Sequence, residues 1–284
     1  MGHFTRRITV ALGFAAGVLF FTADASASGC DLYTETSSCV QNGGIYNVVG
    51  PHPTGTGVID SFLRVQQKGA EEGFNTGARP MMCDGRVCDD KTDPNYTRNL
   101  LTSSVPIVNI NGTNYRQFFL DINEPSATPK GYITLDQVEI FVSNTPNLTT
   151  HTSGAPGYGS IAGATKVYDM ETGSGDNWVN LDYLLVGGGS GWGDMVLYVP
   201  DVGFAGNQYV YLYSAFGCGG TFTASLDCGN GQNKKYQSQA GFEEWWVPGS
   251  TTTTQSPAVP EPASLLLCGS GLLLVAKRYR LRRR

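Results

Sequence analysis

The chain has 284 residues, of which 40% are hydrophobic and only 15% are charged, and its formal net charge is −5. When the two ends of the chain are set aside, the middle has 11 basic and 22 acidic residues, which is a charge of −11. Nucleic-acid binding depends on a basic surface that neutralises phosphates, so this composition argues against a nucleic acid as partner.

Residues 1–27 have the three parts of a secretory signal peptide. Two arginines precede an apolar stretch at residues 8–21, and Ala25-Ser26-Ala27 is an A-x-A cleavage pattern. This pattern predicts a signal helix that is removed during export by the general secretory route. Small residues before Cys30 leave a lipidated N-terminus as the alternative, although Ala27 stands where a lipobox has leucine.

The cysteines agree with an oxidising destination. Of the seven, Cys268 lies in the C-terminal apolar run and is interpreted as a small apolar residue. The other six form three pairs that are local in sequence, and we expect disulfides, although six cysteines allow 15 connectivities. The paired candidates are Cys30 and Cys39, Cys83 and Cys88, and Cys218 and Cys228. A zinc site is the alternative for the second pair, but neither a matching cysteine pair nor a histidine is near it.

Residues 28–247 are predicted to form one all-β domain. Short segments with alternating apolar residues are separated by stretches rich in Gly, Asn and Pro. In residues 115–123, for example, Phe118 and Leu120 alternate with Phe119 and Asp121, as a half-buried strand requires. We therefore expect an antiparallel β-sandwich, jelly-roll-like, with long loops. The candidate strands are residues 45–49, 57–67, 115–123, 132–142, 165–170, 178–186, 195–200, 209–216 and 242–247.

Catalytic patterns are weak in this domain, and we predict that the protein is not an enzyme. His52 and His151 sit in stretches rich in Pro, Gly and Thr, where solvated loop histidines are expected. Glu243 and Glu244 are adjacent, so on a strand they would point to opposite faces and could not form a glycosidase pair with each other. A secreted hydrolase remains the third hypothesis, because acids from different strands could still meet.

A structural calcium ion is a further hypothesis. Calcium prefers six to eight oxygen ligands from carboxylates, amides and carbonyls. Asp121 and Asn123 share one strand face with Glu124 following, and Asp60 and Asp136 lie on candidate strands nearby. Ordinary solvated strand faces and Asx turns explain the same residues.

The aromatic residues raise the possibility of carbohydrate binding. Exposed rings stack on sugar faces, and Trp192 and Trp246 are the candidate sugar contacts. Tyr209, Tyr211 and Tyr213 alternate along one strand face, and for them cross-strand aromatic packing is the favoured interpretation.

The C-terminal end has three ordered parts after a linker. Residues 248–258 are rich in Thr, Ser and Pro, which is typical of a linker. The motif Val259-Pro260-Glu261-Pro262 follows, and then the apolar residues 264–276. As a helix these 13 residues would reach about 20 Å, which is short for a hydrocarbon core of about 30 Å. The chain ends in a basic tail made of Lys277, Arg278, Arg280, Arg282, Arg283 and Arg284.

Residues 259–284 resemble the PEP-CTERM sorting signal of Gram-negative bacteria, in their motif, short apolar helix and basic tail. The resemblance implies recognition by an exosortase, cleavage near the motif and only a transient stay in the inner membrane. An ordinary short anchor on a proline-rich stalk is the alternative. The basic tail also fits the cytoplasmic flank of a membrane segment.

The middle of the chain resembles a recurring ectodomain of PEP-CTERM proteins, which has no established biochemical role. The matching segments are residues 61–76, 118–124, 135–141, 193–195, 209–214 and 241–245. The sequence thus predicts an exported envelope or extracellular-matrix protein with a non-enzymatic structural or interaction role. Its expected partners are the secretion machinery and an exosortase, and a carbohydrate-binding module of the extracellular polysaccharide is the second hypothesis.

Overall fold

The computed structural model describes residues 28–49, 59–91, 93–126, 130–152, 159–171, 176–185, 193–219, 234–239 and 241–249. The predicted signal peptide, sorting motif, C-terminal apolar helix and basic tail lie outside these ranges. Within the described ranges, no helix is both long enough and apolar enough to cross a membrane. Regular structure there consists of strands and two short 3-10 turns, at Thr102–Ser104 and Lys234–Tyr236, which confirms the all-β prediction.

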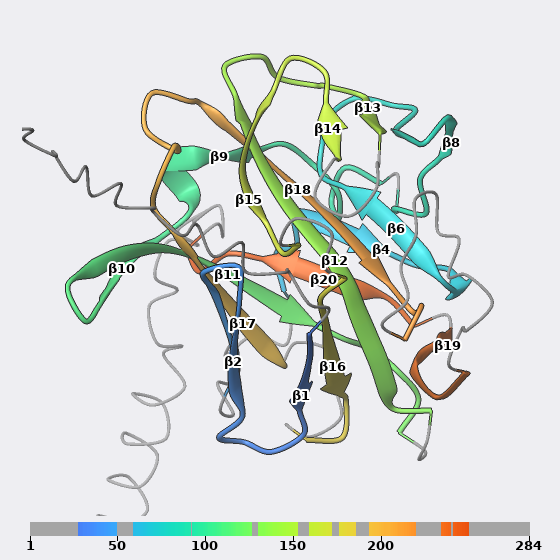
Figure 1. Cartoon of the computed structure of the whole chain (residues 1–284). Coiled ribbons are helices and arrows are strands. Elements are labelled where there is room, and N and C mark those ends of the chain that lie inside the picture. Colours follow the sequence, from blue (N-terminus) through green and yellow to red (C-terminus); the bar gives the residue numbers. More distant parts are fainter. Residues whose placement is uncertain are drawn as a thin grey trace, which may run out of the picture.

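One seven-stranded sheet, which we name sheet A, crosses the centre of the molecule (Figure 1). Its strands are β1 (Gly29–Leu32), β6 (Glu71–Phe74), β9 (Leu100–Leu101), β12 (Tyr132–Ser143), β15 (Thr165–Asp169), β16 (Trp178–Asp182) and β18 (Tyr209–Phe216). Their order is β1-β16-β12-β18-β6, with β15 added to β12 and β9 added to β18. The β1–β16 pair is parallel, and the other pairs in this sheet are antiparallel.

A second seven-stranded sheet, sheet B, lies behind the first. Its strands are β2 (Ser38–Gln41), β3 (Gly44–Val48), β4 (Leu63–Val65), β10 (Ile107–Ile110), β11 (Thr113–Asp121), β17 (Met195–Pro200) and β20 (Glu243–Trp246). The order is β2-β3-β17-β11-β20-β4, with β10 added to β11, and every pair is antiparallel. The β10–β11 hairpin turns through Asn111 and Gly112, both at positive φ, which suits the tight hairpin turns that Asn-Gly favours.

The main core lies between the two sheets. Alternate residues of both sheets, such as Phe118 and Leu197 of sheet B and Val138 and Leu212 of sheet A, are buried in one cluster. Trp245 of sheet B donates a hydrogen bond from Nε1 to Ser214 Oγ of sheet A, at 3.1 Å. This arrangement is sandwich-like, as the alternating sequence pattern predicts.

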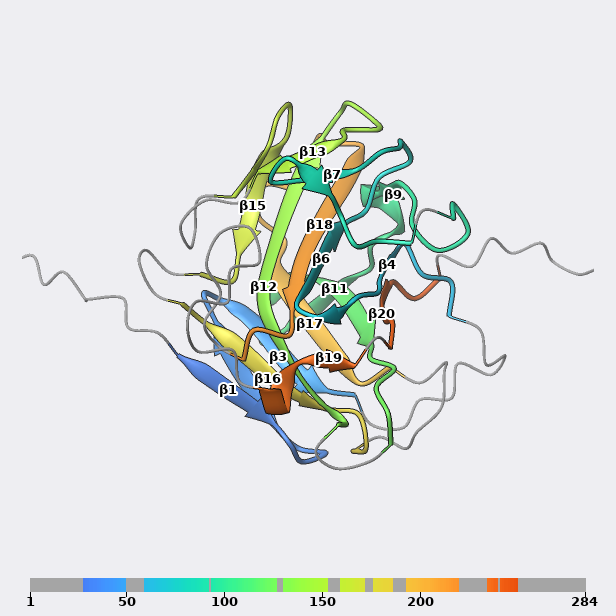
Figure 2. The same ribbon diagram turned by 90° about the vertical axis from the view of Figure 1, so that its right-hand side faces the viewer.

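Two smaller sheets complete the fold, and Figure 2 shows one of them at the top of the molecule and the other near its lower end. The upper sheet has the order β14-β13-β7-β8 and is made of β14 (Ser160–Ile161), β13 (Thr150–Thr152), β7 (Met82–Cys83) and β8 (Arg86–Val87). The lower sheet pairs β19 (Ser238–Gln239) with β5 (Lys68–Gly69).

The upper small sheet covers the outer face of sheet A and forms a second core with it. Phe141, Tyr211 and Tyr213 of sheet A are at most 1% exposed there, and they pack in one cluster with Ile161 and Cys83. The favoured interpretation of the alternating tyrosines as packing residues is therefore correct for Tyr211 and Tyr213.

Two of the three predicted disulfides are seen. Cys30 bonds to Cys39 and Cys83 bonds to Cys88, so the second pair is not a zinc site. Cys218 is also disulfide-bonded, and Cys228 lies outside the described residues. These bonds indicate an oxidising, exported environment.

The predicted strands with clear alternation are found where they were expected. Strands β17 and β18 match their predicted ranges, and β3, β11, β12, β15 and β20 differ from theirs by at most two residues at either end. Strand β4 covers only Leu63–Val65 of the predicted 57–67, and β16 ends at Asp182 rather than 186. The two-residue strands of the small sheets are too short to show a period in sequence.

Candidate ligand-binding face

The outer face of sheet B carries two rows of side chains that run across the strands. In one row, Val40 pairs with Ile45, Ile45 with Tyr198, and Tyr198 with Gln117. Paired residues of antiparallel strands point to the same side, so these four side chains share one face. Val40 is 62% exposed and the other three are partly exposed.

The second row ends in a pair of stacked aromatic rings. Ser38 pairs with Asn47, Asn47 with Val196, Val196 with Phe119, and Phe119 with Trp246. The rings of Phe119 and Trp246 lie 4.5 Å apart between centroids, at 26° to each other. We name the two rows together, from Val40 and Ser38 to Gln117 and Trp246, the aromatic face.

Polar groups on the aromatic face are uncharged. Gln117 Nε2 donates to Tyr198 Oη at 3.4 Å, and Ser38 Oγ donates to Asn47 Oδ1 at 2.6 Å. Trp246 Nε1 is buried and has no hydrogen-bond partner among the described residues. Rings with apolar bodies beside amide and hydroxyl groups suit a neutral ligand that offers both C–H faces and hydroxyl groups.

A charged group borders the aromatic face next to β20. Arg64 forms an ion pair with Glu244 at 2.5 Å, and its guanidinium lies 3.5 Å from the centroid of the Tyr96 ring and 4.4 Å from that of Phe242. Burial raises the pKa of Glu244, and the Arg64 guanidinium opposes that rise. Arg64 is thus held by a carboxylate and two rings.

The residues of the calcium hypothesis make separate contacts. Asp60 pairs with Arg98 at 2.7 Å, and Asp136 accepts a hydrogen bond from the Cys218 amide at 2.7 Å. Asn123 donates to Asp121 at 3.0 Å, so these two do lie together. Glu124 instead accepts from the Gln239 amide, at 3.0 and 3.1 Å to its two oxygens. Within the part of the chain that the structure describes, no group of three or more His, Cys, Asp or Glu residues could hold a metal ion.

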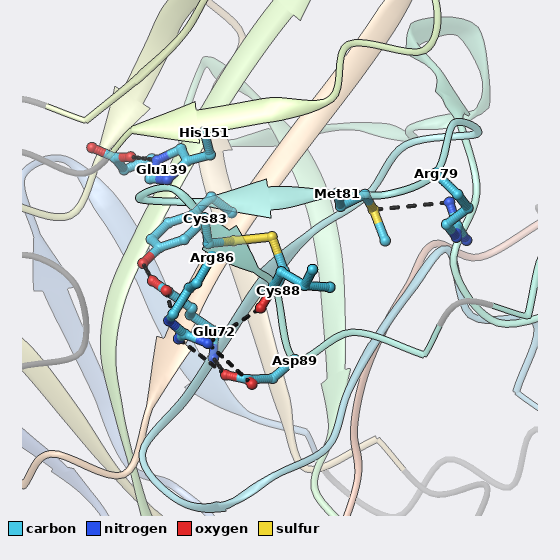
Figure 3. The surroundings of a disulfide bond; sticks show 11 residues. Glu72, Arg79, Met81, Cys83, Arg86, Cys88, Asp89, Glu139 and His151 are labelled. Carbon is cyan, nitrogen blue, oxygen red and sulfur yellow. Dashed lines mark hydrogen bonds and ion pairs between the residues drawn. A yellow bond between two sulfur atoms is a disulfide. The ribbon is translucent and has the colours of Figure 1, made fainter.

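The expectation of a solvated loop for His151 is wrong. His151 lies on β13, is fully buried, and has its Nε2 2.7 Å from Glu139 Oε2 (Figure 3). Its ring stacks on that of Tyr213, with 3.7 Å between centroids. Because polar and turn-forming residues surround His151 in the sequence, no pattern there indicates this strand of three residues. His52 lies outside the described residues.

Charged side chains on both sides of His151 are paired within the second core. Lys166 bridges Glu139 at 2.7 Å and Asp169 at 2.6 Å. Burial would raise the pKa of Glu139, but His151 and Lys166 together hold it below its usual range. On the other side of the ring, Tyr213 donates to Glu72, which also pairs with Arg86 beside the Cys83–Cys88 disulfide (Figure 3). These pairs satisfy buried charges, which is a structural role.

The two adjacent glutamates point to opposite sides of β20, as predicted. Glu244 faces Arg64 on the outer side, whereas Glu243 faces Glu71 and Glu124 inside the sandwich. Glu71 was not identified from the sequence. No motif marks it, and only its position on β6 brings it near the other two.

Two surface cavities lie away from the aromatic face. The larger has about 500 Å³ and is lined by Thr102, Val105, Ile107, Arg116 and Phe204, among others. The smaller has about 240 Å³, and Asp169 is the one carboxylate in its lining. Neither of these two cavities brings together the pair of acids that a glycosidase needs.

Comparison with known proteins gives no relative. No family model, no curated protein and no solved structure matches this chain.

Of the two sugar contacts predicted from the sequence, Trp246 lies on the aromatic face, and Trp192 lies outside the described residues.

Proposed function

We propose that this chain is an exported protein of the cell envelope or extracellular matrix with a non-enzymatic structural or interaction role. The observation that carries the proposal is the order of its parts: a secretory signal, a disulfide-bonded β-sandwich, a linker and a PEP-CTERM-like end. An exosortase is the partner that this end would meet in the inner membrane, before the protein reaches the cell surface or the medium.

The mass of the mature protein from its native host tests this proposal. Removal of residues 1–27 and cleavage near Val259-Pro260-Glu261-Pro262 would both appear as mass losses. Leu266→Asp and deletion of residues 277–284 should each cause mis-sorting or abolish C-terminal processing. Normal localisation and an unchanged mature mass in both variants would show that the C-terminal end is not a sorting signal.

A carbohydrate-binding role is the second candidate, and the aromatic face supports it. The rings of Tyr198 in the first row and of Phe119 and Trp246 in the second are available for stacking, and Gln117 and Asn47 offer amides for hydroxyl groups. The rows contain no charged side chain, and the middle of the chain has a charge of −11, so the ligand class that fits is a neutral polysaccharide.

Binding of the exported protein to neutral and to acidic polysaccharides tests this second role. Trp246→Ala and Tyr198→Ala should each weaken binding to a neutral polysaccharide about tenfold, which corresponds to about 1.4 kcal/mol. Trp192→Ala shows whether the second predicted sugar contact takes part. Val87→Ala, at an exposed position on β8, is the control. No binding by the unaltered protein, or equal binding by all variants, would remove the carbohydrate role.

A further inference from the structure

Three glutamates meet inside the sandwich, between sheet A and sheet B and close to the small sheet of β19 and β5. Glu71 lies on β6 of sheet A, Glu243 on β20 of sheet B, and Glu124 three residues after β11. Each is at most 3% exposed. We name these three residues the carboxyl cluster.

The carboxyl cluster has few hydrogen-bond donors. The Gln67 amide donates to Glu71 Oε2 at 2.5 Å, and the Gln239 amide donates to Glu124. Both oxygens of Glu243 and one of Glu71 are buried with no hydrogen-bond partner among the described residues. A buried carboxylate without donors is strongly destabilising, so a proton or a cation must compensate at least one of the charges.

No cationic side chain of the described residues pairs with the carboxyl cluster. Ser238 on β19 faces Glu71 and Glu124, and Asp89 adds negative charge near Glu71. On the neighbouring strands, Arg64 and Asp121 point to the outer face of sheet B. Asp90, which is bridged to Val65, is a further acid without a hydrogen-bond partner in the described ranges. Asp89 is paired with Arg86 and Asp90 is acted on by Arg79, but among the described residues neither arginine pairs with the cluster itself.

The cluster holds the end of the domain in place. Gln239 and Ser238 form β19, and Ser238 Oγ donates to the Gln67 carbonyl at 2.7 Å. At residue 241 a Cβ would lie 1.9 Å from the Asn123 carbonyl oxygen, so only glycine allows this close approach. Gly241, shortly before β20, is thus pressed against the backbone of Asn123 and Glu124.

We propose that Glu71, Glu124 and Glu243 share protons, and that this shared-proton cluster fastens β19 and β20 to the rest of the domain and loosens them as the pH rises. A protonated Glu243 donates one hydrogen bond to a neighbouring carboxylate, which supplies the donor that the protein itself lacks. The same groups do not form a metal site by geometry, so a proton is the favoured occupant.

The direction of the pH dependence follows from burial. Burial raises the pKa of Glu71 and of Glu124 to about 7, and it raises that of Glu243 well above its ordinary value. In the unfolded chain glutamate titrates near pH 4.3. Between pH 4.3 and about pH 7, the folded state therefore binds more protons than the unfolded chain does. The contribution of the cluster to stability is complete below about pH 4.3 and is lost as the pH rises through 7.

Thermal melting of the mature exported protein from pH 5 to pH 9 tests the proposal. Glu243→Gln keeps the shape and removes the titrating group, so its Tm should exceed that of the unaltered protein by about 3 °C or more at pH 8.5 and by little at pH 5. Glu35→Gln, at an exposed position, is the matched control and should show no pH-dependent difference. Parallel Tm profiles for Glu243→Gln and the unaltered protein would overturn the proposal.

Infrared difference spectra between pH 6 and pH 9 give a readout that needs no stable variant. The unaltered protein should show the C=O stretch of a protonated carboxyl that disappears at high pH, and Glu71→Gln or Glu243→Gln should reduce it. Absence of this band would contradict proton sharing. A Tm that calcium raises and EDTA lowers at pH 8.5, in the unaltered protein but not in Glu243→Gln, would show that a cation occupies the cluster instead. None of these results depends on sorting or on carbohydrate binding.

Discussion

Both large sheets have aromatic side chains on the face that points away from the main core, but the two faces differ in what covers them. On sheet A, Phe141, Tyr211 and Tyr213 lie beneath the small sheet β14-β13-β7-β8 and its disulfide, and they are at most 1% exposed. On sheet B, Phe119, Tyr198 and Trp246 are partly exposed, and no described strand lies over them.

The same alternating sequence pattern therefore has two outcomes. An aromatic ring on an outer face stabilises the fold when another layer covers it, and it can contact a ligand when none does. The covering layer of sheet A is held by the Cys83–Cys88 disulfide and by ion pairs around His151 rather than by long strands. From this contrast we expect a substitution on the covered face of sheet A to lower stability more than the matched substitution on the outer face of sheet B.

The largest expected difference concerns two phenylalanines. Phe141→Ala should lower the free energy of unfolding by about 3–5 kcal/mol, because it leaves a cavity between sheet A and its covering layer. Phe119→Ala should cost about 1 kcal/mol, since its ring is only partly buried. Urea unfolding of both variants measures the two values. Equal losses would show that the outer face of sheet B is also covered.

Whether a strand of either sheet can be predicted from the sequence depends on the length of that strand. Strands such as β11, β17 and β18 have six or more residues, so their existence and their approximate bounds could be predicted. The alternation predicted for residues 115–123 is confirmed, and the side with Phe118, Leu120 and Ile122 is the one buried in the main core. Local pattern is sufficient there because burial imposes a period of two.

The covering layer and the carboxyl cluster depend on contacts between distant segments. Strands of two or three residues, such as β7 and β13, have no period to detect. His151 is buried because residues 82–83 pair beside it, and Glu71 meets Glu243 across 172 positions of the chain. Neither pairing leaves a local pattern in the sequence, so His151 was expected in a solvated loop and Glu71 was not identified.

The next largest effect is expected in the ion pairs of the covering layer. Glu139→Gln should cost about 1.5–3 kcal/mol at pH 7, because His151 and Lys166 would each lose a charged partner. The folded-state pKa of Glu139 is lowered, so its contribution is present above the unfolded value near 4.3 and is lost as the pH falls through the lower folded value. Urea unfolding at pH 7 and pH 3 should show the difference shrinking at pH 3.

Glu35→Gln is the matched control for that measurement, because Glu35 is exposed and makes no ion pair among the described residues. A cost for Glu139→Gln that stays constant from pH 7 to pH 3 would mean that shape rather than charge sets its contribution.

Removal of the disulfide in the covering layer should have a moderate effect. Cys83→Ala with Cys88→Ala opens a short loop, for which the chain-entropy estimate is about 2 kcal/mol. Hydrogen exchange should show faster exchange at β7, β8 and β13, and unchanged exchange at β11 and β17 of sheet B. Uniform acceleration across both sheets would mean that the covering layer is not a separate unit of stability.

The smallest expected difference concerns two tyrosine hydroxyls. Tyr213→Phe removes a buried hydrogen bond to Glu72 and should cost about 1 kcal/mol. Tyr198→Phe removes a hydroxyl from the aromatic face and should change stability by less than about 0.5 kcal/mol. If the aromatic face binds a neutral polysaccharide, Tyr198→Phe should weaken binding more than Tyr213→Phe does. Only the Tyr198 hydroxyl can reach the ligand. A stability loss for Tyr198→Phe as large as that for Tyr213→Phe would show that Tyr198 lies in a packed layer. Its hydroxyl would then not be free to bind a ligand.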